Sequence, residues 1–399
     1  MLTTAFPPWP SFSEEEADAV RRVLLSNAVS YWTGNECRKF EKEFAEWAGA
    51  RHAVAVSNGT VALEAALHAA NIGPGDEVIV APRTFMASVS CVVTVGARPV
   101  FADVDRDTQN VTARSISGQL TPATKAIICV HLAGMPCDMD PIMQLAEEKN
   151  LLVIEDCAQA HGAKYKGRSV GTIGHIGAWS FCQDKIMTTG GEGGMLTTND
   201  AEYWTRMWSF KDHGKSWDAV YNKQYPLGFR WLHESFGTNG RMIEMQAAIG
   251  RIQLRRMKEW TLARRGNMRR ILELAAELPG LRVPECPPWA EHAAYKCYVF
   301  VNDRALAEGW DRDRIMAAIC ERGVPCFTGT CPEVYREKAF DDVGLVPATR
   351  LPVARELGET SLMFLVHPTL ESVHIEQTCE VLQDVMGDAC GSKRKHGRD

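Results

Sequence analysis

The chain has 399 residues, 45% of them hydrophobic, which is enough for a large buried core and about two domains of ordinary size. Lys and Arg total 44 against 50 Asp and Glu, and the net charge of −6 argues against a cationic surface for nucleic acid or anionic lipid. No apolar run reaches the roughly 18 residues of a membrane span and residues 1–14 lack a secretory pattern, so we expect a soluble cytoplasmic protein.

The first half of the chain alternates short β-branched runs with helical stretches, about one pair every 25 residues. Strands are expected at residues 53–57, 77–81, 99–104, 126–131, 151–156 and 178–182, with one further strand at 194–198. Helices are expected between them at 60–70, 86–95 and 140–149. This alternation is typical of an α/β protein whose mostly parallel sheet is wrapped by helices.

The second half has a different texture. A long amphipathic helix is expected at 244–277, with its arginine pairs on the solvent side, followed by a strand at 295–301 and helices at 311–322 and 372–386. We interpret these last elements as a smaller α+β domain. The predicted division is 1–255 for the large domain, 256–390 for the small domain and 391–399 for a disordered tail. The thirteen cysteines include no CxxC pair, so no metal site is predicted.

Residues 57–60, Ser-Asn-Gly-Thr, lead from the first expected strand into a helix. Ligands of open α/β sheets bind beyond the carboxyl ends of the strands, and a helix N-terminus there offers free N–H groups to a phosphate. The same sequence also makes an ordinary helix cap, so this motif alone is weak.

The fifth strand ends in two acids, Glu155 and Asp156. Successive strand residues point to opposite faces, so only one of the two is expected to face a ligand. A buried carboxylate needs a cation or hydrogen-bond donors, because an unpaired buried charge costs several kcal/mol. Gln159 and His161 are close enough in sequence to join the same polar cluster.

Lys185 follows the sixth strand and precedes the glycine-rich segment 190–194. A lysine that loses its proton can form a Schiff base with an aldehyde, although a lone lysine in a flexible loop is more often a surface residue. An amine, a phosphate cradle, an acid and a stacking ring together match pyridoxal phosphate (PLP).

Short motifs from residue 57 to residue 370 then occur in a specific order. They are S-N-G-T-x-A-L at 57–63, T-F-x-A-S at 84–88, E-D-C-A-Q-A-H-G at 155–162, S-F-x-x-x-K at 180–185, G-x-N-x-R-M at 237–242, Q-A-A-I-G at 246–250 and H-P-T-L at 367–370. In these motifs the chain resembles the DegT/DnrJ/EryC1/StrS family of PLP-dependent sugar aminotransferases. The resemblance implies the fold type I of aspartate aminotransferase, with a mostly parallel seven-stranded sheet flanked by helices and a smaller C-terminal α+β domain.

The resemblance also implies roles for residues around the cofactor. Lys185 would bond the aldehyde and later shuttle a proton, and Asp156 would pair with the pyridine nitrogen and keep it protonated. Gln159 would donate a hydrogen bond to the 3′ oxygen, and Phe85 would cover the ring.

Other roles concern the phosphate and the substrate. The phosphate would be held by Gly59, Thr60 and Ser180. Asn239 would reach it from the neighbouring subunit, which implies a homodimer with shared active sites. Lower-ranked substrate contacts are His131, His213 and Arg241.

The implied reaction moves an amino group from L-glutamate or glutamine to a keto-sugar, expected to be linked to a nucleotide, by a ping-pong mechanism in amino-sugar or polysaccharide biosynthesis. Gly240 and Ala133 replace aromatic residues that are frequent in the family, so the acceptor stays open and a cyclitol is an alternative. A sugar dehydratase of the same fold is a second alternative, although such relatives have histidine in place of Lys185. A non-catalytic PLP-binding regulator is a third.

Overall fold

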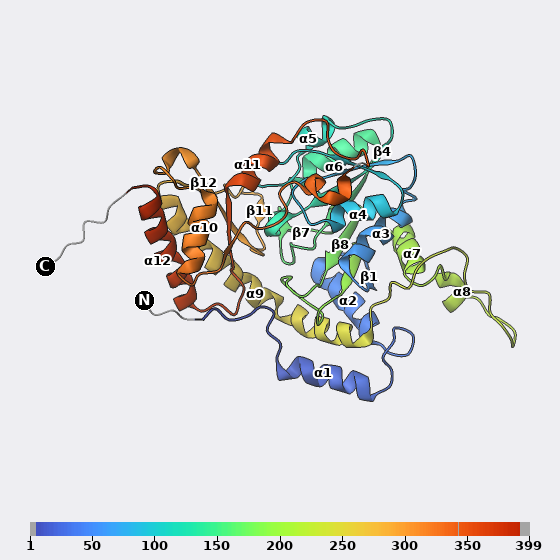
Figure 1. The fold of residues 1–399 in the computed structure, drawn as a ribbon. Coiled ribbons are helices and arrows are strands. Elements are labelled where there is room, and N and C mark those ends of the chain that lie inside the picture. The colour runs from blue at the N-terminus through green and yellow to red at the C-terminus, as the bar shows by residue number, and fades with distance from the viewer. Residues whose placement is uncertain (1–4, 342, 392–399) are drawn as a thin grey trace.

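The computed structural model describes residues 5–341 and 343–391. A central sheet lies between layers of helices, and the long helix α9 connects it to a second unit that carries α10 and α12 (Figure 1). Apart from Gly391, the predicted tail lies outside the described residues. None of the helices in the described ranges is long and apolar enough to cross a membrane.

The central sheet has seven strands in the order β1-β9-β8-β5-β4-β2-β3. Their bounds are β1 (His52–Val56), β2 (Glu77–Val80), β3 (Arg98–Phe101), β4 (Thr124–Val130), β5 (Leu152–Asp156), β8 (Ile176–Ser180) and β9 (Gly194–Thr198). The five neighbouring strands β8, β5, β4, β2 and β3 pair in parallel, whereas β9 is antiparallel to both of its neighbours, β1 and β8. The predicted α/β class and mostly parallel sheet are confirmed, and each predicted strand overlaps an observed one.

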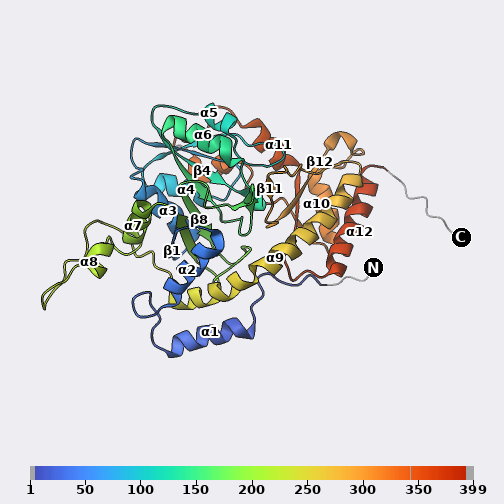
Figure 2. The same cartoon turned by 180° about the vertical axis from the view of Figure 1, so that it is seen from behind.

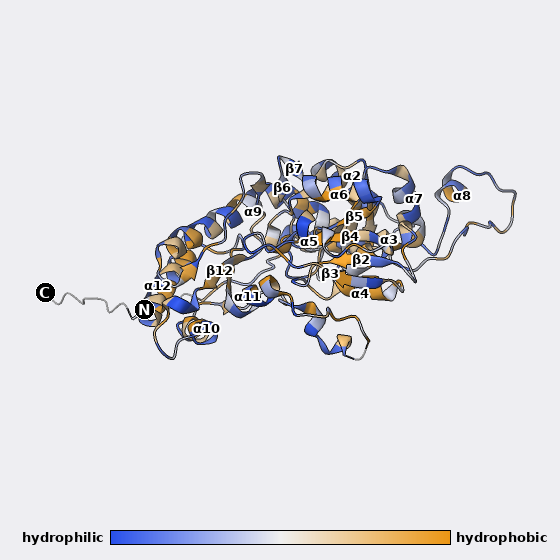
Figure 3. Ribbon diagram, turned by 90° about the horizontal axis from the view of Figure 1, so that it is seen from above, coloured by the Kyte–Doolittle hydropathy of each residue, from blue (hydrophilic) through white to orange (hydrophobic). Residues whose placement is uncertain are grey.

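Helices cover both faces of this sheet. They are α2 (Glu36–Ala48), α3 (Gly59–Ala69), α4 (Ala87–Thr94), α5 (Ala113–Ser117), α6 (Met139–Lys149) and α7 (Ala201–Phe210), and the short helix α8 (Trp217–Tyr221) packs against α7. On one face, Phe44 of α2 packs against Trp179 and Phe181 with ring centroids 5.2 and 5.6 Å apart. Hydrophobic colour gathers on the central strands (Figure 3), as expected for strands buried on both sides.

The second unit has its own antiparallel sheet, in the order β10-β12-β14-β13. Its strands are β10 (Leu281–Arg282), β12 (Cys297–Val301), β13 (Cys326–Phe327) and β14 (Ser361–Phe364), and its helices are α10 (Arg312–Glu321), α11 (Pro352–Thr360) and α12 (Ser372–Ala389). A small third sheet joins β6 (Lys164–Tyr165), β7 (Arg168–Ser169) and β11 (Ala290–Glu291). The sequence predicted β12, α10 and α12 but not β14.

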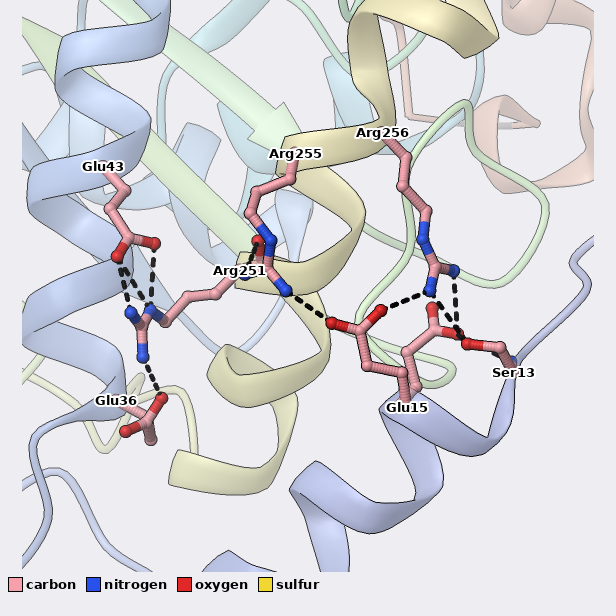
Figure 4. Close-up of polar contacts among 8 residues, drawn as sticks. Ser13, Glu15, Glu36, Glu43, Arg251, Arg255 and Arg256 are labelled. Atoms are coloured by element: carbon pink, nitrogen blue, oxygen red, sulfur yellow. Dashed lines mark hydrogen bonds and ion pairs between the residues drawn. The ribbon is translucent and has the colours of Figure 1, made fainter.

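Helix α9 (Glu244–Glu277) has the predicted bounds and contacts both units, so no break in the chain marks the predicted boundary after residue 255. The division into domains therefore stays a prediction. Arginines of α9 bind acids of α2 and of α1 (Glu14–Leu25), a helix that the sequence analysis did not identify (Figure 4). Arg255 lies on the solvent side as expected, but Arg264 is buried, with its guanidinium 4.9 Å from the ring of Trp9.

Candidate active site

One cavity of about 590 Å³ lies where β5 and β8 end beside the N-terminus of α3. It is lined by seven residues singled out in the sequence: Gly59, Thr60, Phe85, Asp156, Gln159, Ser180 and Lys185. Parallel strands present their carboxyl ends at one edge, which brings these distant residues together. A hollow of about 620 Å³ beside α6 contains none of them, so chemistry and not size identifies the candidate site.

One part of the cavity lining is a cradle of hydrogen-bond donors. The side chain of Asn58 caps α3 by accepting a hydrogen bond from the Val61 N–H at 2.9 Å, which leaves the N–H groups of Gly59 and Thr60 at the open first turn. A Cβ on Gly59 would lie 2.6 Å from the Cβ of Ser180, so only glycine allows the helix to approach β8 this closely. Free N–H groups, two hydroxyls and the positive helix end suit a phosphate.

Another part of the lining is the carboxylate of Asp156, which is only 5% exposed. One oxygen accepts a hydrogen bond from the Ser88 hydroxyl at 2.7 Å, and the other accepts from the Ala158 N–H at 3.1 Å. The Ser88 hydroxyl in turn lies 2.7 Å from the hydroxyl of Thr84, which precedes α4. The sequence analysis quoted Ser88 within a motif but gave it no role, and the structure shows that it fixes the acid.

Glu155 points to the opposite face, as the alternation of strand residues predicts. It is fully buried and accepts hydrogen bonds from three backbone N–H groups, those of Gly171, Ile173 and Gly174. Burial raises the pKa of Glu155, but the hydrogen bond and charge of His131, together with the N–H groups of Gly171 and Gly174, lower it overall. Glu155 is therefore a structural carboxylate outside the cavity.

His131, a lower-ranked substrate candidate, belongs to this structural network instead. Its Nε2 is 2.9 Å from Glu155, its Nδ1 accepts from the Cys137 N–H at 3.0 Å, and the side chain is fully buried. Both ring nitrogens are thus occupied by the protein. Cys157 completes a buried trio that resembles a metal site, but burial raises its thiol pKa well above the ordinary value and Glu155 already accepts N–H groups at both oxygens.

The side chains of Gln159 and His161 lie in different places, although both were expected in one polar cluster with the acids that end β5. Gln159 lines the cavity, and its amide oxygen accepts from the Ala133 N–H at 2.9 Å, which leaves its NH₂ group for an acceptor. His161 packs against Trp179 and Phe181, and among the described residues neither of its nitrogens has a hydrogen-bond partner. Burial, followed by nearby positive charges, lowers the pKa of His161 from 6.5 to about 3.

This buried imidazole predicts a loss of stability in acid. Between pH 6.5 and about 3 only the unfolded chain binds the proton of His161, so the free energy of unfolding falls with pH by up to about 1.4 kcal/mol per unit. His161→Phe keeps a packed ring and removes this term. Urea unfolding at pH 7, 6 and 5 should therefore show a shallower decline for the variant. Equal declines in both proteins would contradict the assignment.

Lys185 lines the cavity beside Asp184, with 3.9 Å between its Nζ and the nearer carboxylate oxygen. The hydroxyl of Tyr295 donates to the other oxygen of Asp184 at 2.6 Å, and Nζ is 5.4 Å from the Tyr295 ring. Burial raises the pKa of Asp184, but the charge of Lys185 and the bond from Tyr295 lower it overall. The sequence analysis gave Tyr295 no role, because only folding brings it to the lysine.

Besides His131, three predicted residues do not line this cavity: Asn239, His213 and Arg241. Asn239 and His213 are exposed, and Arg241 binds Asp212 at 2.7 Å, beside the backbone bridge between Asp212 and Asn239. The segment therefore presents Asn239 outward, and the roles predicted for these residues remain predictions.

Comparison with known proteins extends over most of the chain. The model of the DegT/DnrJ/EryC1/StrS aminotransferase family matches residues 10–383. The chain is 35% identical to the spore coat polysaccharide biosynthesis protein SpsC of Bacillus subtilis, covering 95% of this chain and 96% of that protein. It is 36% identical to a UDP-N-acetyl-3-dehydro-alpha-D-glucosamine 3-aminotransferase of Acidithiobacillus ferrooxidans, covering 90% and 91%. The crystal structure of an aminotransferase from Psychrobacter cryohalolentis, 61% identical, superposes with a TM-score of 0.95 over 96% of this chain and 99% of that one.

Proposed function

The chain belongs to the DegT/DnrJ/EryC1/StrS aminotransferase family, and from this we propose that it moves an amino group from L-glutamate or L-glutamine to a nucleotide-linked keto-sugar. The observation that carries the proposal is the single cavity in which Lys185, Asp156 and the N-terminus of α3 meet. Similarity to an enzyme named for a UDP-linked sugar supports the nucleotide, and similarity to SpsC supports a place in polysaccharide biosynthesis.

The residues of the cavity fit PLP. The donors of Gly59, Thr60 and Ser180 suit its phosphate, the fixed carboxylate of Asp156 suits a protonated pyridine nitrogen, and the NH₂ group of Gln159 suits its 3′ oxygen. When bound, the cofactor supplies an electron sink for the negative charge that develops beside the transferred nitrogen. Phe85 lines the cavity with 64% of its surface exposed, and in this proposal it would cover the flat ring of the cofactor.

Lys185 has two tasks in this proposal. Its Nζ holds the cofactor between turnovers, and once released it accepts a proton from the amino donor and returns one to the acceptor. Asp184 and Tyr295 fix the direction of approach through their 2.6 Å bond. Because one site serves both substrates in turn, the 2-oxo acid leaves before the keto-sugar enters, which gives ping-pong kinetics.

We further propose a homodimer with shared sites. The loop that follows α8 stands away from the rest of the chain (Figures 1 and 2), whereas α8 itself packs through Trp217 against Trp208 of α7. Large hydrophobic side chains are exposed at the end of α8 and on the loop, residues 221–236, which we call the arm. They are Tyr221, Leu227, Phe229, Trp231 and Phe236. Exposed groups of this kind mark an association surface, and the arm leads directly to outward-facing Asn239. A second copy of the chain would cover the arm and receive Asn239 at its phosphate.

Mixed dimers test this arrangement. Asn239→Asp sets a negative charge against the partner's phosphate and should weaken cofactor binding on the order of 10²-fold. Lys185→Ala inactivates its own subunit. Co-expression of the two variants should restore activity in about one quarter of sites, because half of the random dimers carry one intact site. Activity no greater than the sum of the separate variants would exclude shared sites.

The reaction is tested with a panel of acceptors. Nucleotide-linked keto-sugars and cyclitols are offered with glutamate or glutamine, and amino product and 2-oxo acid are quantified. The proposal predicts equal amounts of amino-sugar and 2-oxo acid with at least one nucleotide-linked acceptor. A deoxygenated sugar formed without 2-oxo acid would instead indicate a dehydratase, and turnover of cyclitols alone would exclude the nucleotide-linked substrate.

A further inference from the structure

The loop that follows Lys185 is held from outside the sheet at two points. The indole N–H of Trp9 donates to the Lys185 carbonyl at 2.8 Å, and the Thr188 N–H donates to the amide oxygen of Gln253 at 2.9 Å. Between these points Ile186 and Met187 are fully buried. The backbone that carries the lysine is thus fixed on both sides by distant residues.

Gln253 on α9 connects this loop to α1. Its NH₂ group donates to one carboxylate oxygen of Glu16 at 2.8 Å, and both side chains are 1% exposed. A backbone N–H can only donate and a carboxylate can only accept, so the two contacts fix the orientation of the amide. The other oxygen of Glu16 accepts from the N–H and hydroxyl of Ser13 and from Arg256 at 3.1 Å, in the α1–α9 contact of Figure 4.

The side chain of Trp9 is also fixed by its neighbours. Its ring packs edge-on against Trp260 with centroids 5.1 Å apart and nearly parallel to His367 at 6.0 Å. The guanidinium of buried Arg264 lies 4.9 Å from the same ring. These three contacts fix the indole ring of Trp9, so its N–H stays directed at the Lys185 carbonyl.

We propose that residues 9–16 act as an N-terminal brace, in which Trp9 directly, and Glu16 through Gln253, position Lys185 for bond formation with the cofactor. The proposal rests on the function proposed above for Lys185. Neither Trp9 nor Gln253 lines the cavity. They are positioning residues, and they differ from a general structural contact because each bonds the backbone of the lysine loop itself.

The test compares Trp9→Phe, which keeps the ring and removes only its N–H, with Gln253→Met, which keeps the length and removes both hydrogen bonds. The controls are Arg255→Gln, which cuts the ion pair to Glu15 at the same α1–α9 contact, and Trp310→Phe, which lies far along the chain in the second unit. Full-length proteins freed of cofactor receive PLP, and its visible absorbance reports the rate of covalent capture.

Both test variants are expected to capture PLP about tenfold more slowly and to lower kcat about tenfold, because small misplacement of a reacting group is costly. KM for the substrates should stay within about twofold, and the controls should match the wild type. Capture is measured below the unfolding temperature of every variant, so a stability change alone cannot produce the result. If Trp9→Phe does not fold, the capture rate of Gln253→Met alone tests the proposal.

Wild-type capture rates in the test variants would overturn the brace, as would equal slowing in Arg255→Gln. Failure of the proposed function is a separate outcome. If borohydride reduction attaches no cofactor to Lys185 in the wild-type protein, the role of the lysine fails. If Lys185 is labelled but the variants behave normally, only the brace fails.

Discussion

Lys185→Ala is expected to lower turnover on the order of 10⁴-fold, since the chain then lacks both the amine that holds the cofactor and the group that moves the proton. The donors around α3 and Asp156 remain, so the variant should still bind PLP, but without a covalent bond. Gel filtration in denaturant should therefore release all cofactor from the variant after borohydride treatment and none from the wild type. Lys149→Ala, at an exposed position that ends α6, is the control and should behave as wild type. Wild-type turnover by Lys185→Ala would contradict the assignment.

Asp156→Asn is expected to lower kcat on the order of 10³-fold, as found when a key electrostatic partner of a transition state is removed. The amide keeps the size of the carboxylate, and its single oxygen can still accept from the Ala158 N–H, while its NH₂ group can donate to the Ser88 hydroxyl. It cannot hold a protonated pyridine nitrogen by charge, so the cofactor loses its electron-withdrawing power while the lysine is intact. The measurement is kcat together with the visible spectrum of the bound cofactor.

Ser88→Ala provides the matched comparison. It removes one of the two hydrogen bonds to Asp156 and leaves the charge, so a loss of only about fivefold is expected. A similar loss in both variants would mean that the orientation of the carboxylate matters more than its charge. A near-normal rate for Asp156→Asn would remove Asp156 from the mechanism.

Local sequence patterns were sufficient to predict the strands of the central sheet and several of the residues at its carboxyl edge. Apolar runs of strand length, ended by turn residues, predicted all seven strands, because a strand buried on both faces has a continuous hydrophobic sequence. The alternation rule anticipated that Glu155 and Asp156 separate, and the structure adds that Asp156 is the one that lines the cavity. The phosphate cradle could be predicted because residues 57–60 lead from a strand into a helix, whose first turn has free N–H groups.

The residues that hold the lysine could not be found in this way. Trp9, Gln253 and Tyr295 reach Lys185 or its neighbours only through contacts across more than 60 positions of sequence, and no local spacing encodes them. The prediction for Arg264 was wrong. The charged pattern of the helix predicted that this residue faces solvent, whereas the fold buries it against Trp9. Tertiary packing decides such positions, and periodicity alone cannot.

The central claim is that Lys185 bonds a cofactor whose far end meets Asp156. The most direct measurement is borohydride reduction of the purified protein with PLP, followed by mass spectrometry of its peptides. We expect one phosphopyridoxyl group per chain, on Lys185, and the same modification at a lower rate in Asp156→Asn. Modification of another lysine in place of Lys185, or of none, would contradict the account.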